Sequence, residues 1–229
     1  MNYDNYWTEK TERREKNNYY EKRYNKVIDF LSPAKIGTIL DLGGGNGQFM
    51  EYIDKRFFTK RLSEIWDISQ SGIDIAKAKG FTAKLIDIQK PIIYNKKYSV
   101  IYLAETLEHL KNPNITLINA YNLLEEKGNL IVIQPNSKAD NKHHIRQYKY
   151  KEIKNDIIKS GFNIINEKVT PAFESWSINK KDLLSFNPKL WVCFLLTLLP
   201  YSIRNLFANI YPSRFALFYI FRARKRIIK

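Results

Sequence analysis

The sequence predicts an α/β fold, in which a mostly parallel seven-stranded sheet is covered by helices on both faces. Three observations support this. Strand and amphipathic-helix patterns alternate along residues 38–133, a glycine cluster follows the first strand pattern, and 44% of the residues are hydrophobic, enough for a large core. Alternation of this kind requires right-handed crossovers between parallel strands, so both faces of the sheet are expected to be buried.

The predicted elements follow one another in a regular order. Residues 21–31 carry apolar side chains at helical spacing, and Ser32-Pro33 ends that helix. Strands are predicted at residues 38–42, 62–66, 83–86, 98–104, 129–133, 162–169 and 215–224, the last pairing with the sixth. Helices are predicted at residues 48–56, 69–79, 116–126 and 149–160, and the last three end near a glycine.

These patterns divide the chain into three parts. Residues 1–35 form an N-terminal helical segment, residues 36–170 carry the alternating core, and residues 171–229 form an apolar, basic C-terminal segment with the last strand. We expect the third part to insert a lid over a substrate pocket. Its apolar side chains are Trp176, Phe186, Trp191, Phe194, Leu195, Leu198 and Leu199.

Charge and cysteine content limit the partners and the compartment. The formal net charge is +15, which favours polyanions or an anionic membrane surface as neighbours, and residues 180–229 contain ten basic residues and one acidic residue. Cys193, the one cysteine, excludes an intramolecular disulfide and a cysteine-based zinc site. No secretory signal and no apolar run of about 20 residues is present, so we expect a cytoplasmic protein without a transmembrane helix.

A glycine-rich loop between the first strand and the next helix is the strongest functional signal. Asp41, Gly43, Gly44, Gly45 and Gly47 lie there, where glycines allow the backbone to approach a nucleotide-like cofactor. Gln48 stands where the dinucleotide fingerprint has its third glycine, which weakens a nicotinamide interpretation. Asp67, at the end of the second strand, can accept hydrogen bonds from both ribose hydroxyls, and Asp87, after the third, can reach an adenine edge.

Together these features resemble the class I methyltransferases that use S-adenosylmethionine. Residues 41–47 match their first motif, Asp67 matches their ribose-binding acid, and residues 98–128 match the stretch around their fourth and fifth strands. The resemblance covers about residues 25–170. It implies a Rossmann-like fold and S-adenosylmethionine as the cofactor. The implied cofactor-binding residues are Asp41, Gly43, Gly44, Gly45, Gly47, Asp67, Ile68, Asp87, Ile88 and Ala104.

The segment after the fourth strand points to an oxygen acceptor. Enzymes that methylate exocyclic or amide nitrogens usually carry Asn/Asp-Pro-Pro-aromatic there, whereas this chain has Ala-Glu-Thr-Leu at residues 104–107. Glu105, Glu108 and His109 fall at i, i+3 and i+4, so one helical turn would place them on a common face. Two carboxylates and an imidazole suit a divalent metal ion, and His144 is a candidate fourth ligand.

The Glu-x-x-Glu-His pattern with a later histidine resembles ubiquinone-pathway O-methyltransferases and small-RNA 3′-terminal 2′-O-methyltransferases, in which these positions bind a metal. Two alternatives stay open. His109 and Glu108 can act as an acid–base pair without metal, or the two glutamates can be acids at a helix N-terminus and His109 a packed residue.

The expected methyl acceptor is a hydroxyl of a small molecule or saccharide, free or linked to lipid. The C-terminal basic residues favour peripheral contact with an anionic membrane, and a similar mixture of basic and aromatic residues can follow RNA. An RNA ribose 2′-O-methyltransferase and a non-catalytic nucleotide-binding module are therefore the alternatives. The oligomeric state is not predicted. The basic residues concerned are Arg204, Arg214, Arg222, Arg224, Lys225 and Arg226.

Overall fold

The structure is a computed structural model that describes residues 19–33, 37–136, 144–171, 198–210, 212 and 216–226. The first part of the predicted N-terminal segment lies outside these ranges. Of the residues expected in the lid or on the basic surface, Trp176, Phe186, Trp191, Phe194, Leu195 and Arg214 also lie outside the described residues.

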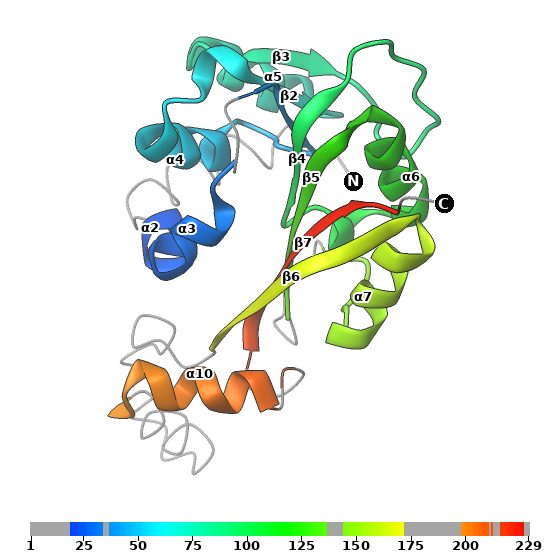
Figure 1. Ribbon diagram of the computed structural model, residues 1–229. Coiled ribbons are helices and arrows are strands. Elements are labelled where there is room, and N and C mark those ends of the chain that lie inside the picture. Colours follow the sequence, from blue (N-terminus) through cyan, green and yellow to red (C-terminus); the bar gives the residue numbers. More distant parts are fainter. Residues whose placement is uncertain are drawn as a thin grey trace.

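One seven-stranded sheet forms the centre of the molecule, which confirms the predicted fold class (Figure 1). Its strands lie in the order β3-β2-β1-β4-β5-β7-β6, and all neighbours are parallel except β7, which is antiparallel to both β5 and β6. The strands are β1 (Ile39–Leu42), β2 (Ser63–Asp67), β3 (Thr82–Leu85), β4 (Tyr98–Ala104), β5 (Leu124–Pro135), β6 (Phe162–Pro171) and β7 (Ala216–Lys225).

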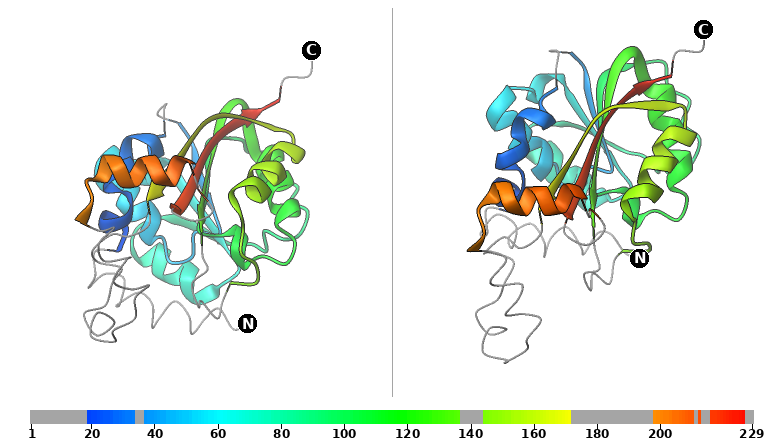
Figure 2. Two further views of the ribbon diagram at one scale, coloured as in Figure 1. Left: turned by 90° about the horizontal axis from the view of Figure 1, so that it is seen from below. Right: turned by 60° about the horizontal axis from the view of Figure 1, so that its bottom comes forward.

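Helices cover both faces of the sheet (Figure 1). One face carries α2 (Tyr19–Tyr24), α3 (Ile28–Leu31), α4 (Gln48–Phe57) and α5 (Gln70–Ala78), and the other carries α6 (Pro113–Leu123) and α7 (Tyr150–Lys159). Three short 3-10 turns, η1 (Asn25–Val27), η2 (Lys60–Leu62) and η3 (Leu107–His109), connect described elements. Helix α10 (Tyr201–Ile210) lies beyond one end of the sheet, next to β6 and β7 (Figure 2). None of the described helices is long and apolar enough to cross a membrane.

Three elements differ from the sequence prediction. The helix predicted over residues 21–31 is divided into α2, the 3-10 turn η1 and α3. The final strand pairs with β6 as expected, but it is inserted between β5 and β6 and so also pairs with β5. The helix predicted over residues 116–126 ends at Leu123, because Leu124 is buried and pairs with Tyr98 at the start of β4. Tertiary pairing therefore overrides helix propensity at Glu125 and Glu126, which belong to an extended chain.

The apolar core consists of two clusters, one on each face of the sheet. Successive residues of a strand point to opposite faces, so Ile39 packs with α4 and α5, while Leu40 packs with α6 and α7. Both side chains are fully buried. This two-sided burial explains why the central strands read as continuous apolar runs in the sequence.

The strand order reverses between β1 and β4. From β1 the chain proceeds outward through β2 and β3, and β4 then begins on the other side of β1. In open α/β sheets, ligands bind at the carboxyl ends of the strands at such a reversal. Here those ends lead into the glycine loop after β1 and the turn after β4, which contain half of the site residues predicted from sequence.

Candidate active site

The glycine loop packs directly against the turn that follows β4. Gly43 has a φ of +79°, and its N–H donates a hydrogen bond to the carbonyl of Trp66 over 2.7 Å. A Cβ atom at Gly43 would lie 2.3 Å from the Thr106 methyl carbon, so no larger residue fits without movement of the backbone or of Thr106. The Thr106 hydroxyl also donates to the carbonyl of Leu42 over 3.3 Å. The loop and the turn therefore form one packed unit.

Asp41 lies beneath the same loop and is fully buried. A Cβ atom at Gly44 would come within 2.5 Å of its Oδ2, so glycine at position 44 makes room for the carboxylate. Within the described part of the chain, neither carboxylate oxygen of Asp41 has a hydrogen-bond partner. Burial, with a smaller contribution from the nearby Asp67 carboxylate, raises the pKa of Asp41 to about 8.

This raised pKa predicts a pH dependence of stability. Unfolded Asp41 ionises near its ordinary pKa of 3.8, whereas the folded protein retains the proton up to about pH 8. The free energy of unfolding should therefore fall as pH rises from about 4 to about 8, by at most about 1.4 kcal/mol per pH unit from this group. Urea unfolding at several pH values, compared between the native protein and Asp41→Asn, measures it. Equal pH slopes for the two proteins would contradict the assignment.

Asp67 is held at the end of β2 by backbone donors from both sides. Its Oδ2 accepts a hydrogen bond from the Gly45 N–H over 2.8 Å, and its Oδ1 accepts one from the Ser69 N–H over 2.9 Å. These bonds fix the carboxylate beside the glycine loop, in the position expected for a ribose-binding acid. Gly47, with a φ of +74°, caps α4 at the far end of the loop.

The remaining predicted cofactor residues lie around this loop. Ile68 is 46% exposed beside Asp67, and the Ile88 methyl carbon Cδ1 would lie 3.3 Å from a Cβ at Gly43. Asp87 accepts a hydrogen bond from the Gln89 N–H over 3.0 Å and pairs with Lys90. Ala104 is the last residue of β4. The structure thus places all the predicted cofactor residues at, or just after, the carboxyl ends of β1 to β4.

The turn after β4 carries Glu108 and His109 on the 3-10 element η3. Glu108 is 1% exposed, and its Oε2 accepts a hydrogen bond from the Gln134 side-chain amide over 3.2 Å. His144 reaches this turn because the N–H groups of Ile145 and Arg146 both donate to the Glu108 carbonyl, over 2.9 and 3.2 Å. These bonds bring His144 close to His109, which lies 35 positions earlier in the chain.

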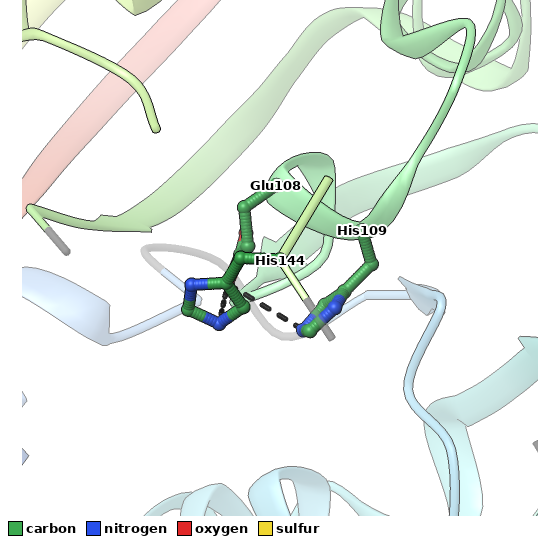
Figure 3. A group of neighbouring side chains, drawn as sticks. All are labelled: Glu108, His109 and His144. Carbon is green, nitrogen blue, oxygen red and sulfur yellow. Dashed lines mark ion pairs between the residues drawn. The ribbon is translucent and has the colours of Figure 1, made fainter. Parts of the chain in front are cut away.

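Glu108, His109 and His144 form a compact group (Figure 3). Glu108 Oε1 lies 3.8 Å from His109 Nε2 and 4.0 Å from His144 Nε2, and the two imidazole rings meet edge to face with centroids 4.8 Å apart. One ligand atom from each residue lies within 4.8 Å of the other two. The group offers one carboxylate and two imidazoles, which can bind a divalent cation or move a proton.

Glu105, predicted from sequence as a further ligand, does not join this group. The expected helical turn from residue 105 does not form, because Glu105 adopts a left-handed φ of 54° and the 3-10 turn begins only at Leu107. Its carboxylate instead accepts a hydrogen bond from the Tyr24 hydroxyl and lies 3.9 Å from Arg23 Nη1.

Sequence reasoning missed three residues that shape the site. Thr106 joins the turn to the glycine loop, Gln134 holds the Glu108 carboxylate, and Tyr24 binds Glu105. Gln134 could have been noticed in the sequence, because it is a polar residue at the end of an apolar run. The structure shows that it is fully buried, where a polar side chain needs a hydrogen-bond partner. Tyr24 and Thr106 had none, because their partners are 81 and 64 residues away in the chain.

Comparison with known protein families matches residues 15–166 to the family described as methyltransferase domain. The chain belongs to this family. The family and many structurally similar proteins are class I S-adenosylmethionine-dependent methyltransferases, which confirms the resemblance stated from the sequence and S-adenosylmethionine as the cofactor. A comparison with curated protein sequences finds no match.

Several solved structures share the fold of this methyltransferase, although their sequence identity to it is low. The partner of the Trm112 methyltransferase activator from Haloferax volcanii aligns with a TM-score of 0.72 and 12% identity, covering 100% of this chain and 97% of that one. A TehB-like S-adenosylmethionine-dependent methyltransferase from Corynebacterium glutamicum has a TM-score of 0.59 and 15% identity, covering 97% and 98%. The O-methyltransferase NcsB1 from neocarzinostatin biosynthesis, solved with S-adenosylmethionine and 2-hydroxy-5-methyl naphthoic acid, has a TM-score of 0.60 and 11% identity, covering 91% and 55%.

Proposed function

We propose that this methyltransferase transfers the methyl group of S-adenosylmethionine to a hydroxyl oxygen of a small molecule or saccharide. The observation that carries the proposal is the group formed by Glu108, His109 and His144 at the carboxyl end of β4, packed against the glycine loop through Thr106. An acid–base or metal-binding group beside the methyl donor is what a hydroxyl acceptor requires, because its proton must leave as the oxygen attacks.

The cofactor would lie along the loop that follows β1. Asp67, fixed by the N–H groups of Gly45 and Ser69, would accept both ribose hydroxyls. Asp41, buried next to Asp67, keeps its proton up to about pH 8 in the free protein, and a bound cation would lower its pKa and favour the charged carboxylate. S-adenosylmethionine carries both an ammonium and a sulfonium group, so its charge suits this carboxylate.

The transfer itself is an in-line displacement. The acceptor oxygen forms a bond to the methyl carbon as the bond from that carbon to sulfur breaks, which leaves S-adenosylhomocysteine, and the hydroxyl proton passes to a base. His109 is the proposed base, with side-chain exposure of 18%, and Glu108, 3.8 Å away, stabilises its protonated form. In this arrangement the proton would leave the acceptor beside the bound methyl donor.

The same three residues also suit a divalent metal ion. Their donor set is one carboxylate oxygen and two imidazole nitrogens, with the carboxylate held from behind by Gln134. Such a set accepts zinc, manganese or iron, and a bound ion would lower the pKa of a coordinated hydroxyl. We propose Glu108, His109 and His144 as the ligands. Glu105 is not among them, because its carboxylate accepts a hydrogen bond from Tyr24 on α2.

An acceptor screen tests this function. Release of S-adenosylhomocysteine should be measured with pools of catechols, saccharides, prenylated lipids and short RNAs. We expect turnover with a small-molecule or saccharide pool and loss of that turnover when the acceptor hydroxyl is replaced by hydrogen. Turnover confined to the RNA pool would contradict the proposed acceptor class and favour ribose 2′-O-methylation. Binding of S-adenosylmethionine without turnover in any pool would favour the non-catalytic alternative.

We also propose that α10 contacts an anionic membrane surface. Ile203, Leu206, Phe207 and Ile210 follow helical spacing and are 40–57% exposed, whereas Ala208, on another side of the helix, is fully buried. The apolar stripe of α10 therefore faces outward. The sequence contains no acidic residue after Asp182, so nothing in that stretch repels anionic lipid. An outward apolar stripe on a basic segment is the pattern of an interfacial helix.

Liposome flotation measures this contact. The native protein should float with anionic vesicles and not with neutral ones, and salt should weaken the binding because it screens the basic residues. Leu206→Glu should abolish flotation, since it places a charge in the apolar stripe. Ile93→Glu is the matched control, because Ile93 is 97% exposed in the loop after β3. Equal flotation of both variants, or none for the native protein, would refute the contact.

A further inference from the structure

Glu105 adopts a strained backbone conformation in the turn that carries the site residues. It is the first residue after β4, and apart from Phe58 it is the one non-glycine residue with a positive φ in the described part of the chain. A left-handed backbone is unfavourable for glutamate and persists only where the surroundings enforce it. Its N–H donates to the carbonyl of Ile133 on β5 over 2.9 Å, which holds the backbone from one side.

The N-terminal helix α2 holds Glu105 from the other side. The Tyr24 hydroxyl donates a hydrogen bond to Glu105 Oε1, and the Tyr24 side chain is fully buried. Arg23 Nη1 lies 3.9 Å from Glu105 Oε2, and the Arg23 guanidinium stacks over the Phe218 ring, 4.8 Å from its centroid. The hydrogen bond from the Tyr24 hydroxyl to the Glu105 carboxylate is charge-assisted, a class that is among the stronger hydrogen bonds in proteins.

Helix α2 is in turn packed on the helix that begins at the glycine loop. Tyr24 meets Phe49 edge to face with ring centroids 6.1 Å apart, and Tyr20 stacks on Tyr52 at 6.1 Å. Phe49 and Tyr52 both belong to α4. Helix α2 therefore connects the cofactor loop, through α4, with the turn after β4, through Glu105.

We propose that Tyr24 and Glu105 are a positioning pair for methyl transfer. The hydrogen bond from Tyr24 keeps Glu105 left-handed, and this backbone conformation directs the turn so that Thr106 packs on the glycine loop and Glu108 and His109 meet His144. The inference rests on the proposed function of that group, and Glu105 acts through the turn rather than on the acceptor. Without the bond, the turn relaxes and the reacting groups lose their alignment with the methyl donor.

Tyr24→Phe tests the pair, because it removes one hydroxyl and keeps the aromatic packing. We expect kcat to fall about tenfold or more, as small displacements of reacting groups cost this much, while the dissociation constant for S-adenosylmethionine stays within about twofold. Tyr52→Phe is the matched control. Tyr52 lies in the same aromatic cluster, but its hydroxyl donates to Asn25 over 3.0 Å. Equal kcat values for Tyr24→Phe and the native protein would overturn the proposal.

A second measurement needs no acceptor and so separates this inference from the proposed function. The chain contains three histidines, so imidazole proton resonances can be assigned individually by NMR. Tyr24→Phe should shift the resonances of His109 and His144, and Tyr52→Phe should leave them unchanged. In a Glu105→Gly background, Tyr24→Phe should have no further effect, because its partner carboxylate is gone. Unmoved His109 and His144 resonances in Tyr24→Phe would refute the pair even if no acceptor were known.

Discussion

His109→Ala should lower kcat by about 100-fold or more while S-adenosylmethionine still binds with native affinity. His109 is the proposed proton acceptor or metal ligand beside the acceptor hydroxyl, and general base catalysis contributes about 10²–10⁴-fold. Thr106, which contacts the cofactor loop, is unchanged in this variant, so we expect binding of the donor not to change. Steady-state kinetics and isothermal titration measure the two effects separately.

Glu108→Gln should reduce kcat to a similar degree, because it removes the charge that stabilises a protonated His109 or a bound cation. Lys111→Ala is the control, since Lys111 is exposed just beyond the same turn. Chelation separates the two mechanisms. Activity that is lost with a chelator and restored by a divalent ion supports the metal, whereas unchanged activity after exhaustive chelation excludes it and leaves His109 as a base. Native kcat in both His109→Ala and Glu108→Gln would refute the catalytic assignment.

Asp67→Ala should weaken S-adenosylmethionine binding by about 100-fold or more. The carboxylate would lose hydrogen bonds to two ribose hydroxyls, each worth about 1.5–3 kcal/mol to a charged acceptor. The substitution would also remove the carboxylate that accepts the hydrogen bond from the Gly45 N–H in the glycine loop. Isothermal titration with S-adenosylmethionine measures the loss, and circular dichroism checks that the variant is folded.

Asp74→Ala is the matched control for Asp67→Ala. Asp74 is an exposed aspartate on α5, the helix that follows Asp67, and its Oδ1 accepts a hydrogen bond from the nearby Gln70 side-chain amide. Its substitution should leave cofactor affinity unchanged. If Asp67→Ala bound the cofactor as tightly as Asp74→Ala, the ribose assignment would be wrong.

Local patterns in the sequence were sufficient for the fold class and for the cofactor loop. Continuous apolar strands indicate a sheet covered on both faces, and glycines between a strand and a helix indicate a loop that a ligand can approach closely. Asp67 could be placed as well, because the end of a parallel strand has a known position relative to that loop. Each of these inferences depends on neighbours within about twenty residues.

Tertiary structure alone decided that Glu105 does not belong to the group after β4, whereas Glu108, His109 and His144 were all named from the sequence. Sequence spacing put Glu105 with Glu108 and His109, since it assumed a regular helical turn from residue 105. Long-range contacts replaced that turn with a left-handed Glu105 bound by Tyr24, and the backbone bonds from Ile145 and Arg146 to Glu108 brought in His144. Such contacts join residues far apart in the chain, so their energies can outweigh local propensity without leaving a local signal.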